Sequence, residues 1–376
     1  MDLENSQTAT LEKFGFSHRE KGGRSYTPGQ TIFLEGEPGN ELFVVLEGTV
    51  SITVQGREVD RLEAGTIFGE MALVDDRPRS ATAQAYTETI LLPLDYKRFM
   101  DSVERKPEFA VHVMSVMSNR MRRYMEEELR QQRMQEELKI GRRIQLSLLP
   151  DRCPTIPGME FAATYQAARQ VGGDLYDFIL IPGEHNRLQF VIADVTGKGV
   201  PAALFMASAR TAFRAESMSK NEPAEILART NHLISLDIKT PLFLSAFYVS
   251  VETDTGKMSF ANGGHEFPYW LRKQKGELES LSFPGVLLGA FDDMVFENHE
   301  INLESGDYLV FFTDGVTEAR NSEGGFYGND RLEQVIKSRE WLNADTLLAA
   351  ITESVKSFTG DTPPADDLTL VVMRRE

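Results

Sequence analysis

The chain has little cysteine, no long apolar run and too few basic residues to balance its acidic ones. Cys153 is the only cysteine in 376 residues, which excludes an intrachain disulfide and is typical of proteins in a reducing compartment. No apolar stretch reaches the roughly 18 residues that a membrane span needs. The first residues, MDLENSQTATLEKFGF, are acidic and polar and do not resemble a signal peptide. These absences predict a cytoplasmic protein without membrane segments.

The shortage of basic residues also indicates which kinds of molecule the chain can bind. The chain has 40 Lys and Arg residues against 57 Asp and Glu, a formal net charge of −17. Nucleic-acid binding depends on basic surfaces that neutralise phosphates, so we expect no nucleic-acid partner. The sequence contains no repeat and no long low-complexity tract, and its length is sufficient for two domains and a connector.

Four aspartates in the last two-thirds of the chain have similar surroundings. They are Asp174 in VGGDLYDF, Asp194 in FVIADVTGKG, Asp314 in YLVFFTDGVTEA and Asp366 in DDLTLVV. A single Asp beside a strand is ordinarily part of a turn. Three of these flank apolar runs of strand length, and several buried carboxylates that converge need cations. Carboxylate oxygens without a Cys or His cluster favour Mg²⁺ or Mn²⁺ over Zn²⁺. The pattern therefore suits hydrolysis assisted by two metal ions.

These motifs also carry a family resemblance. Residues 142–376 resemble the bacterial SpoIIE-like branch of the metal-dependent type 2C protein Ser/Thr phosphatases, through IQLSLLP, VGGDLYD, ADVTGKG, ANGGHEFP, FFTDGVTEA and DDLT in that order. The resemblance implies that Asp194 bridges two ions, that Asp174 and the Val195 carbonyl serve one, and that Asp314 and Asp366 hold the other. Asp367 is the less favoured neighbour, because consecutive strand side chains point to opposite faces.

The resemblance implies hydrolysis without a protein nucleophile, and it leaves the proton donor unassigned. Eukaryotic type 2C enzymes have a His two residues after the bridging Asp, where this chain has Thr196. His265 is a candidate donor by composition, and a purely structural role is an equal alternative. Lys198 is either a contact for substrate phosphate or a solvated loop lysine.

The first hundred residues form a different unit. Short β-like runs alternate with Gly-bearing turns, which predicts a small all-β barrel or jelly roll. Within it, Gly69 and Glu70 precede the apolar turn Met-Ala-Leu, and a loop then leads to Arg79. Backbone N–H groups of a helical turn beside an Arg make an anion-binding site.

These residues resemble the phosphate-binding cassette of cyclic nucleotide-binding domains. The resemblance implies that Arg79 binds the cyclic phosphate and that Glu70 binds the ribose 2′-hydroxyl. The other cassette positions are Gly69, Ala72, Ser80 and Ala81, and the turn glycines are Gly36, Gly48 and Gly65. The ligand is either cAMP or cGMP, and Ser80 does not discriminate between them. The alternative is an empty pocket closed by a Glu70–Arg79 salt bridge.

Between these units, residues 109–149 have the pattern of one or two long helices. Apolar residues recur at steps of three and four, charge is dense between them, and no proline interrupts the segment. The apolar seam favours a coiled-coil homodimer, although Glu128, Gln131, Gly141 and Gln145 interrupt it, and a solvated spacer helix is the alternative. Ile144 and Leu148 share one helical face, which we expect to pack on the catalytic domain.

The sequence thus predicts a multidomain α+β protein in three parts. Residues 1–105 form a β jelly-roll that binds cyclic nucleotide, residues 106–150 a helical connector, and residues 151–376 an α/β/β/α phosphatase sandwich. The predicted function is a phosphoserine/phosphothreonine protein phosphatase regulated by cyclic nucleotide, acting on a phosphorylated anti-sigma-factor antagonist in a partner-switching pathway. Two alternatives are an interaction protein with an inactive phosphatase domain, and an active phosphatase whose barrel serves only for dimerisation.

Overall fold

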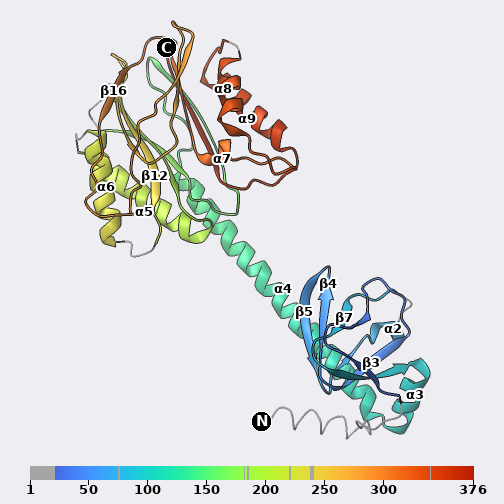
Figure 1. Ribbon diagram of the computed structural model, residues 1–376. Coiled ribbons are helices and arrows are strands. Elements are labelled where there is room, and N and C mark those ends of the chain that lie inside the picture. The colour runs from blue at the N-terminus through green and yellow to red at the C-terminus, as the bar shows by residue number, and fades with distance from the viewer. Residues whose placement is uncertain are drawn as a thin grey trace. The chain divides into compact units, whose positions relative to one another are not determined.

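The computed structural model describes residues 22–74, 77–181, 183, 186–219, 222–237, 241–338 and 340–376. The prediction that the N-terminal segment is not a signal peptide falls on residues outside these described ranges. The chain divides into two compact units, Met1–Gln132 and Arg133–Glu376. The boundary falls within helix α4 (Glu108–Leu148), so each unit is described by itself (Figure 1).

The first unit is a jelly roll of two four-stranded sheets, which confirms the predicted β-rich fold. One sheet has the order β1 (Arg24–Tyr26), β8 (Thr89–Asp95), β3 (Glu41–Glu47), β6 (Ile67–Phe68), and the other β2 (Thr31–Phe33), β7 (Thr82–Ala85), β4 (Thr49–Val54), β5 (Arg57–Glu63). The turn glycines Gly36, Gly48 and Gly65 all have positive φ, as sharp turns between short strands require.

Strand β3 is buried on both faces. Phe43 and Val45 point into the space between the sheets, whereas Leu42 and Val44 pack on the other side with Phe109 of α4. This alternation follows from the two-residue period of a strand. Helix α3 (Tyr96–Arg105) covers the same outer face and begins at Asp95, whose side chain accepts a hydrogen bond from the Arg98 amide at 2.7 Å. The sequence pattern places this segment in the β-rich unit that ends at residue 105 and does not predict α3.

Helix α4 is a single helix of 41 residues, and it leaves a row of apolar side chains exposed. These are Met114, Met121, Met125, Leu129 and Ile140, each at least half exposed. No helix of the described residues is both long and apolar enough to cross a membrane.

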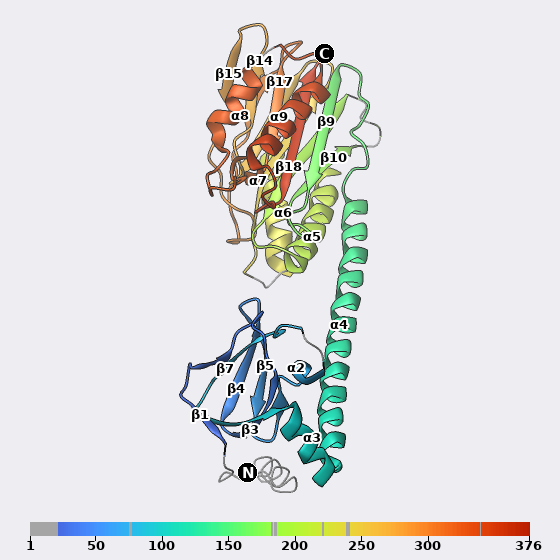
Figure 2. The same ribbon diagram turned by 90° about the vertical axis from the view of Figure 1, so that its right-hand side faces the viewer.

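The second unit is an α/β/β/α sandwich, as predicted. One sheet has the order β10 (Leu175–Leu180), β11 (Arg187–Val195), β12 (Leu244–Glu252), β13 (Lys257–Gly263), β16 (His299–Asn302); the other has β15 (Glu277–Ser280), β14 (Tyr269–Arg272), β17 (Tyr308–Phe312), β18 (Leu368–Arg375), β9 (Met159–Gln166). Helices α5 (Val200–Ser217) and α6 (Pro223–Asp237) cover the first sheet, and α8 (Gly328–Lys337) and α9 (Ala344–Thr359) cover the second (Figure 2). All four lie where the patterns of VPAALFMASARTAFRAE, PAEILARTNHLISL, RLEQVIKS and TLLAAITESVKSF predict helices.

Aromatic side chains fill the space between these two sheets. Phe190 of β11 and Phe311 of β17 have ring centroids 4.9 Å apart, and Phe247 stacks on Phe260 at 5.2 Å. All four rings are fully buried, and burial of each stabilises the fold by roughly 1.5–3 kcal/mol. This packed core fixes the strand ends at the edge where the aspartates lie.

Candidate functional site

The four aspartates come from both sheets of the sandwich. Asp174 precedes β10, Asp194 is the penultimate residue of β11, Asp314 begins the short helix α7 (Asp314–Thr317) after β17, and Asp366 lies in the loop before β18. Asp194 is electrostatically coupled to Asp174, Asp314 and Asp366. The sandwich therefore brings the four predicted residues to one edge.

Asp174 is the most enclosed of the four, with 1% of its surface exposed. Its Oδ2 atom accepts hydrogen bonds from the hydroxyls of Thr313 at 2.7 Å and Thr369 at 2.6 Å. Burial, and then the charge of Asp194, raise the pKa of Asp174 well above its usual value. Thr369 belongs to β18 and Thr313 directly follows β17, so Asp174 is tied to the second sheet at this edge.

The neighbouring carboxyl groups are also hard to ionise. Burial, followed by the charge of Asp314, raises the pKa of Asp194 to about 7. Burial, followed by the charge of Asp366, raises the pKa of Asp314 to about 6. None of the groups that shift the pKa of Asp174 or Asp194 is a cation. Lys198 lowers the pKa of Asp314 and pairs with Asp366, so the excess of negative charge centres on Asp174 and Asp194.

This charge fits divalent cations, which carboxylate oxygens bind well. Among the described residues, no three His, Cys, Asp or Glu side chains converge in a ready-made ligand arrangement, so the fit rests on charge and donor chemistry. At the rim, Lys198 Nζ lies 2.6 Å from Asp366 Oδ2 and also donates to the Ala365 carbonyl. Lys198 is thus held beside a predicted ligand.

Two glycines allow the Asp174 loop to pass against its neighbours. A Cβ on Gly173 would lie 2.8 Å from the Val195 carbonyl oxygen, and one on Gly172 would lie 2.3 Å from Asp367 Oδ2. Neither approach leaves room for a side chain. The Val195 carbonyl, which the resemblance assigns to the same ion as Asp174, lies beside that loop.

Asp367 has a different role from Asp366. Its Oδ1 accepts a hydrogen bond from the Ala168 amide at 2.8 Å, and its Oδ2 accepts one from the Gly173 amide at 2.6 Å. It is 6% exposed. Asp367 therefore holds the loop that carries Asp174, and Asp366 stays the predicted ligand.

Gln145 of α4 holds the same loop and was missed as a functional residue. Its Nε2 donates to the Gly172 carbonyl at 2.6 Å, and its Oε1 accepts from the Gly172 amide at 3.0 Å. Gln145 is 5% exposed, whereas Ile144 is 60% exposed. The expectation that Ile144 packs on the catalytic domain is therefore wrong. The only indication in the sequence is that Gln145 lies in the IQLSLLP motif. In the apolar seam of the connector the same residue looks like an interruption.

A cavity of about 180 Å³ opens beside the aspartates and is lined by Asp194, Asp314, Ser245, His265 and Glu266, among others. The ring of His265 is buried, its Nδ1 lies 2.7 Å from the Ser245 hydroxyl, and burial lowers its pKa to about 3. A histidine with this pKa is neutral near pH 7 and has no imidazolium proton to donate. The structural role is the one that fits His265.

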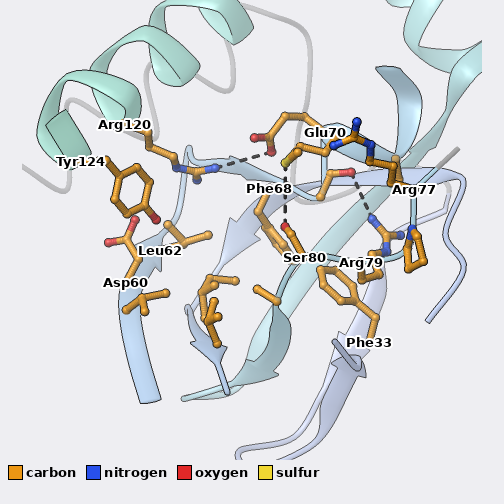
Figure 3. Close-up of a pocket in the computed structure, with 18 residues that line it drawn as sticks. Phe33, Asp60, Leu62, Phe68, Glu70, Arg77, Arg79, Ser80, Arg120 and Tyr124 are labelled. Atoms are coloured by element: carbon orange, nitrogen blue, oxygen red, sulfur yellow. Dashed lines mark hydrogen bonds and ion pairs between the residues drawn. The ribbon is translucent and has the colours of Figure 1, made fainter. Parts of the chain in front are cut away.

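The first unit contains a larger cavity, of about 420 Å³, lined by the whole predicted cassette (Figure 3). Arg79 is 9% exposed and donates to the backbone carbonyls of Gly69 at 3.1 Å and Glu41 at 2.8 Å. Its guanidinium lies 4.2 Å from the centroid of the Phe33 ring. Its Nε is buried without a hydrogen-bond partner among the described residues, and burial lowers the pKa of Arg79. A buried cation without a carboxylate partner suits an anionic ligand.

Glu70 pairs with α4 rather than with Arg79. Its Oε2 lies 3.5 Å from Arg120 Nη1, and Arg120 Nη2 donates to the Ile67 carbonyl at 2.6 Å. The salt bridge that would close an empty pocket is therefore not formed. Gly69, Ala72, Ser80 and Ala81 line the cavity as predicted, and α4 adds Arg120 and Tyr124. The sequence of the connector does not indicate that Arg120 and Tyr124 line this cavity, because that depends on where α4 packs.

Comparison with known proteins agrees with both parts. Residues 23–106 match the cyclic nucleotide-binding domain family, and residues 184–376 match the family described as stage II sporulation protein E (SpoIIE). The chain is 29% identical over 246 residues to the phosphoserine phosphatase RsbU of Bacillus subtilis, covering 65% of this chain and 72% of RsbU. It is 26% identical to the protein IcfG of Synechocystis over 75% of this chain and 48% of IcfG. The SiaA-PP2C domain of Pseudomonas aeruginosa has the same fold, with a TM-score of 0.59 and 24% identity over 65% of this chain and 98% of that domain.

The fold and these matches define a PP2C-type protein serine/threonine phosphatase joined to a cyclic nucleotide-binding domain. Because the SpoIIE match covers more than half of the 376 residues, the chain belongs to the SpoIIE family.

Proposed function

We propose that this chain is a Mn²⁺- or Mg²⁺-dependent phosphoserine/phosphothreonine protein phosphatase whose activity responds to a cyclic nucleotide. The observation that carries the catalytic part is the convergence of Asp174 and Asp194 with Asp314 and Asp366, in which burial and neighbouring carboxylates raise the pKa values of Asp174 and Asp194. Asp174, Asp194 and the Val195 carbonyl would hold one ion. Asp194, Asp314 and Asp366 would hold the other.

When bound, two such ions supply Lewis-acid stabilisation for the phosphoryl group and lower the pKa of coordinated water. The chain's own residues provide orientation. Thr313 and Thr369 hold one carboxylate oxygen of Asp174 through hydrogen bonds from their hydroxyl groups. Asp367 fixes the loop that carries Asp174. Lys198, beside Asp366, adds positive charge where a phosphate monoester would approach.

The regulatory part is supported by the cavity around Arg79 and Glu70. Its volume of about 420 Å³ is within the range of small-molecule sites. Arg79 supplies a charge-assisted contact for a cyclic phosphate, and Glu70 supplies an acceptor for a ribose hydroxyl. If the barrel serves only for dimerisation, no cyclic nucleotide will bind there.

Helix α4 supports a route between the two activities. In the first unit it contributes Arg120, which pairs with Glu70. In the second unit it contributes Gln145, which holds the Gly172 backbone next to Asp174. A ligand that changes the Glu70–Arg120 pair thus acts on the helix that also holds the metal-site loop. Such coupling is typically about 1–3 kcal/mol, which is about a 5- to 100-fold change in affinity or rate.

The partners follow from the family. A phosphorylated anti-sigma-factor antagonist is the proposed substrate on the strength of the resemblance to SpoIIE-like phosphatases, and the relative with 29% identity is named a phosphoserine phosphatase. The exposed apolar row on α4, including Met114, Met121 and Met125, supports pairing with a second copy of the chain, because such a row is otherwise left in water.

The test is hydrolysis of a phosphoserine protein or a simple phosphate ester by the full chain, with Mn²⁺ or EDTA and with or without cAMP or cGMP. We expect activity only with metal, and a 5- to 100-fold response to one nucleotide. Metal-independent activity would contradict the catalytic proposal. An inert chain with Mn²⁺ would favour the interaction-protein alternative, and activity indifferent to both nucleotides would contradict the regulatory part.

The Gln145→Leu variant tests the route through α4, because leucine keeps the bulk and loses both hydrogen bonds. We expect nucleotide binding to persist while the response of hydrolysis to nucleotide is lost. Gln131→Leu, at an exposed position of the same helix, is the matched control. A full response in Gln145→Leu would show that the signal does not pass through this contact.

A further inference from the structure

The two ends of the nucleotide cavity differ in chemistry. One end has the cation Arg79 with Ser80, and the other has the carboxylate of Asp60 with the ring of Tyr124 (Figure 3). If the cyclic phosphate binds at Arg79, as the proposed function requires, the base extends toward Asp60. The polar group at that end then decides which base fits.

The carboxylate of Asp60 is held in a fixed position. Its Oδ1 accepts a hydrogen bond from the Arg61 amide at 3.0 Å, and its Oδ2 lies 3.3 Å from Arg123 Nη2 of α4. Asp60 belongs to β5, where it pairs with Ile52 of β4, and its side chain is 19% exposed. An ionised carboxylate offers about four lone-pair positions, so two remain after these contacts. The group is therefore pre-positioned and still able to accept hydrogen bonds.

An ionised carboxylate accepts hydrogen bonds and cannot donate them. Guanine presents two adjacent donors on one edge, the N1–H and the 2-amino group, which together match two carboxylate oxygens. Adenine presents its 6-amino donor beside the lone pair of N1, so a second carboxylate oxygen would face an acceptor. Two acceptors that face each other form no hydrogen bond and repel, which adds discrimination against adenine.

We propose that Asp60 is the specificity-determining residue of the cavity and that it selects guanine, so that cyclic GMP is the ligand. Tyr124 lines the same end of the cavity, and Val54, Val59 and Leu62 provide apolar walls on the side of the strands. This inference rests on the proposed nucleotide-binding function and adds the identity of the base.

The experiment is calorimetric titration of the full chain with cGMP, cAMP and cyclic inosine monophosphate, which lacks the 2-amino group. We expect cGMP to bind about 5- to 100-fold more tightly than cAMP, the scale of one bidentate base contact, with the inosine nucleotide between them. In Asp60→Asn the amide offers one acceptor and one donor, which complement the 6-amino group and N1 of adenine. The order of cGMP and cAMP should therefore reverse or become equal.

Glu63→Gln removes the same charge from the same strand at an exposed position and should keep the parent's order. Thermal unfolding of the variants confirms that each is folded. Parent protein that binds cAMP at least as tightly as cGMP, or an Asp60→Asn protein that keeps the parent's preference, would overturn the role of Asp60 while leaving nucleotide sensing intact. If no cyclic nucleotide binds at millimolar concentration, the sensing proposal fails and this inference fails with it.

Discussion

Asp174 and Asp177 are three residues apart, and each is 1% exposed, yet their surroundings are opposite. Asp177 Oδ2 lies 3.1 Å from Arg210 Nε, and its Oδ1 accepts from Arg214 Nη2 at 2.8 Å. Asp174 meets two threonine hydroxyls and the carboxyl group of Asp194. The fold thus pairs one buried aspartate with its own arginines, whereas the other meets hydroxyl and carboxyl groups. Burial alone therefore does not identify a functional carboxylate, whereas a missing counter-charge does.

The two candidate sites differ in the sign of the charge that they enclose. The cavity of the first unit encloses the cation Arg79, whose hydrogen-bond partners are neutral carbonyls. The edge of the second unit gathers carboxylates without a cation beside Asp174 or Asp194. The first site thus contains a buried cation that has no carboxylate among its hydrogen-bond partners, and the second contains an excess of carboxylates, so we expect an anion at one and cations at the other.

The largest expected effect comes from removing the central anion of the metal site. Asp194→Ala should lower Mn²⁺-dependent hydrolysis by about 1,000-fold or more, because a ligand shared by both ions is lost. Asp361→Ala, at an exposed position before the last strand, removes the same charge and should leave activity unchanged. Steady-state rates at saturating Mn²⁺ measure the effect. Activity of Asp194→Ala within a few-fold of the parent would contradict the two-ion site.

The next effect concerns stability and tests the Asp174–Asp177 comparison. Asp177→Ala should lower the free energy of unfolding by about 3–5 kcal/mol, because it leaves Arg210 and Arg214 without their buried partner. Asp174→Ala in EDTA should cost far less, because it also relieves repulsion with Asp194. Urea unfolding of both variants in EDTA provides the values. Equal losses of stability would show that the two aspartates are both structural.

A smaller effect is expected in the nucleotide cavity. Arg79→Ala should weaken cyclic nucleotide binding by about 2–3 kcal/mol, the scale of a hydrogen bond to a charged group. Glu70→Ala should weaken it as well and remove the preference for ribose over 2′-deoxyribose ligands. Calorimetry on the full chain measures both changes. Unchanged affinity in Arg79→Ala would place the phosphate elsewhere.

The smallest effect is the pH dependence of the metal-free protein. Folding raises the pKa of Asp194 from 3.8 to about 7, so the folded state binds a proton that the unfolded state has released. This contribution to stability is present below about pH 4 and is lost as pH rises toward 7. Between pH 5 and 8 in EDTA, the parent's melting temperature should fall by about 2–6 °C more than that of Asp194→Asn. Parallel pH profiles of the two proteins would contradict the raised pKa.

Local patterns were sufficient to predict most elements and the main candidate residues. Asp194 and Asp314 adjoin apolar runs that form β11 and β17, and the helices of the sandwich have clear periodicity. The segment of α3 was misassigned because it follows directly on a strand of the barrel. Gln145 was taken as a flaw in a seam, because the sequence does not show that its amide faces the Gly172 backbone.

The sequence by itself determined where most strands and helices form, which aspartates lie at strand ends, and that Glu70 and Arg79 share one short cassette. Only the tertiary structure decided which charges have partners. Arg214 reaches Asp177 from 37 residues along the chain, and Arg120 reaches Glu70 from a different element. Strand and helix patterns depend on neighbouring residues, whereas charge compensation depends on distances in space, and those are set by how the sheets and helices pack.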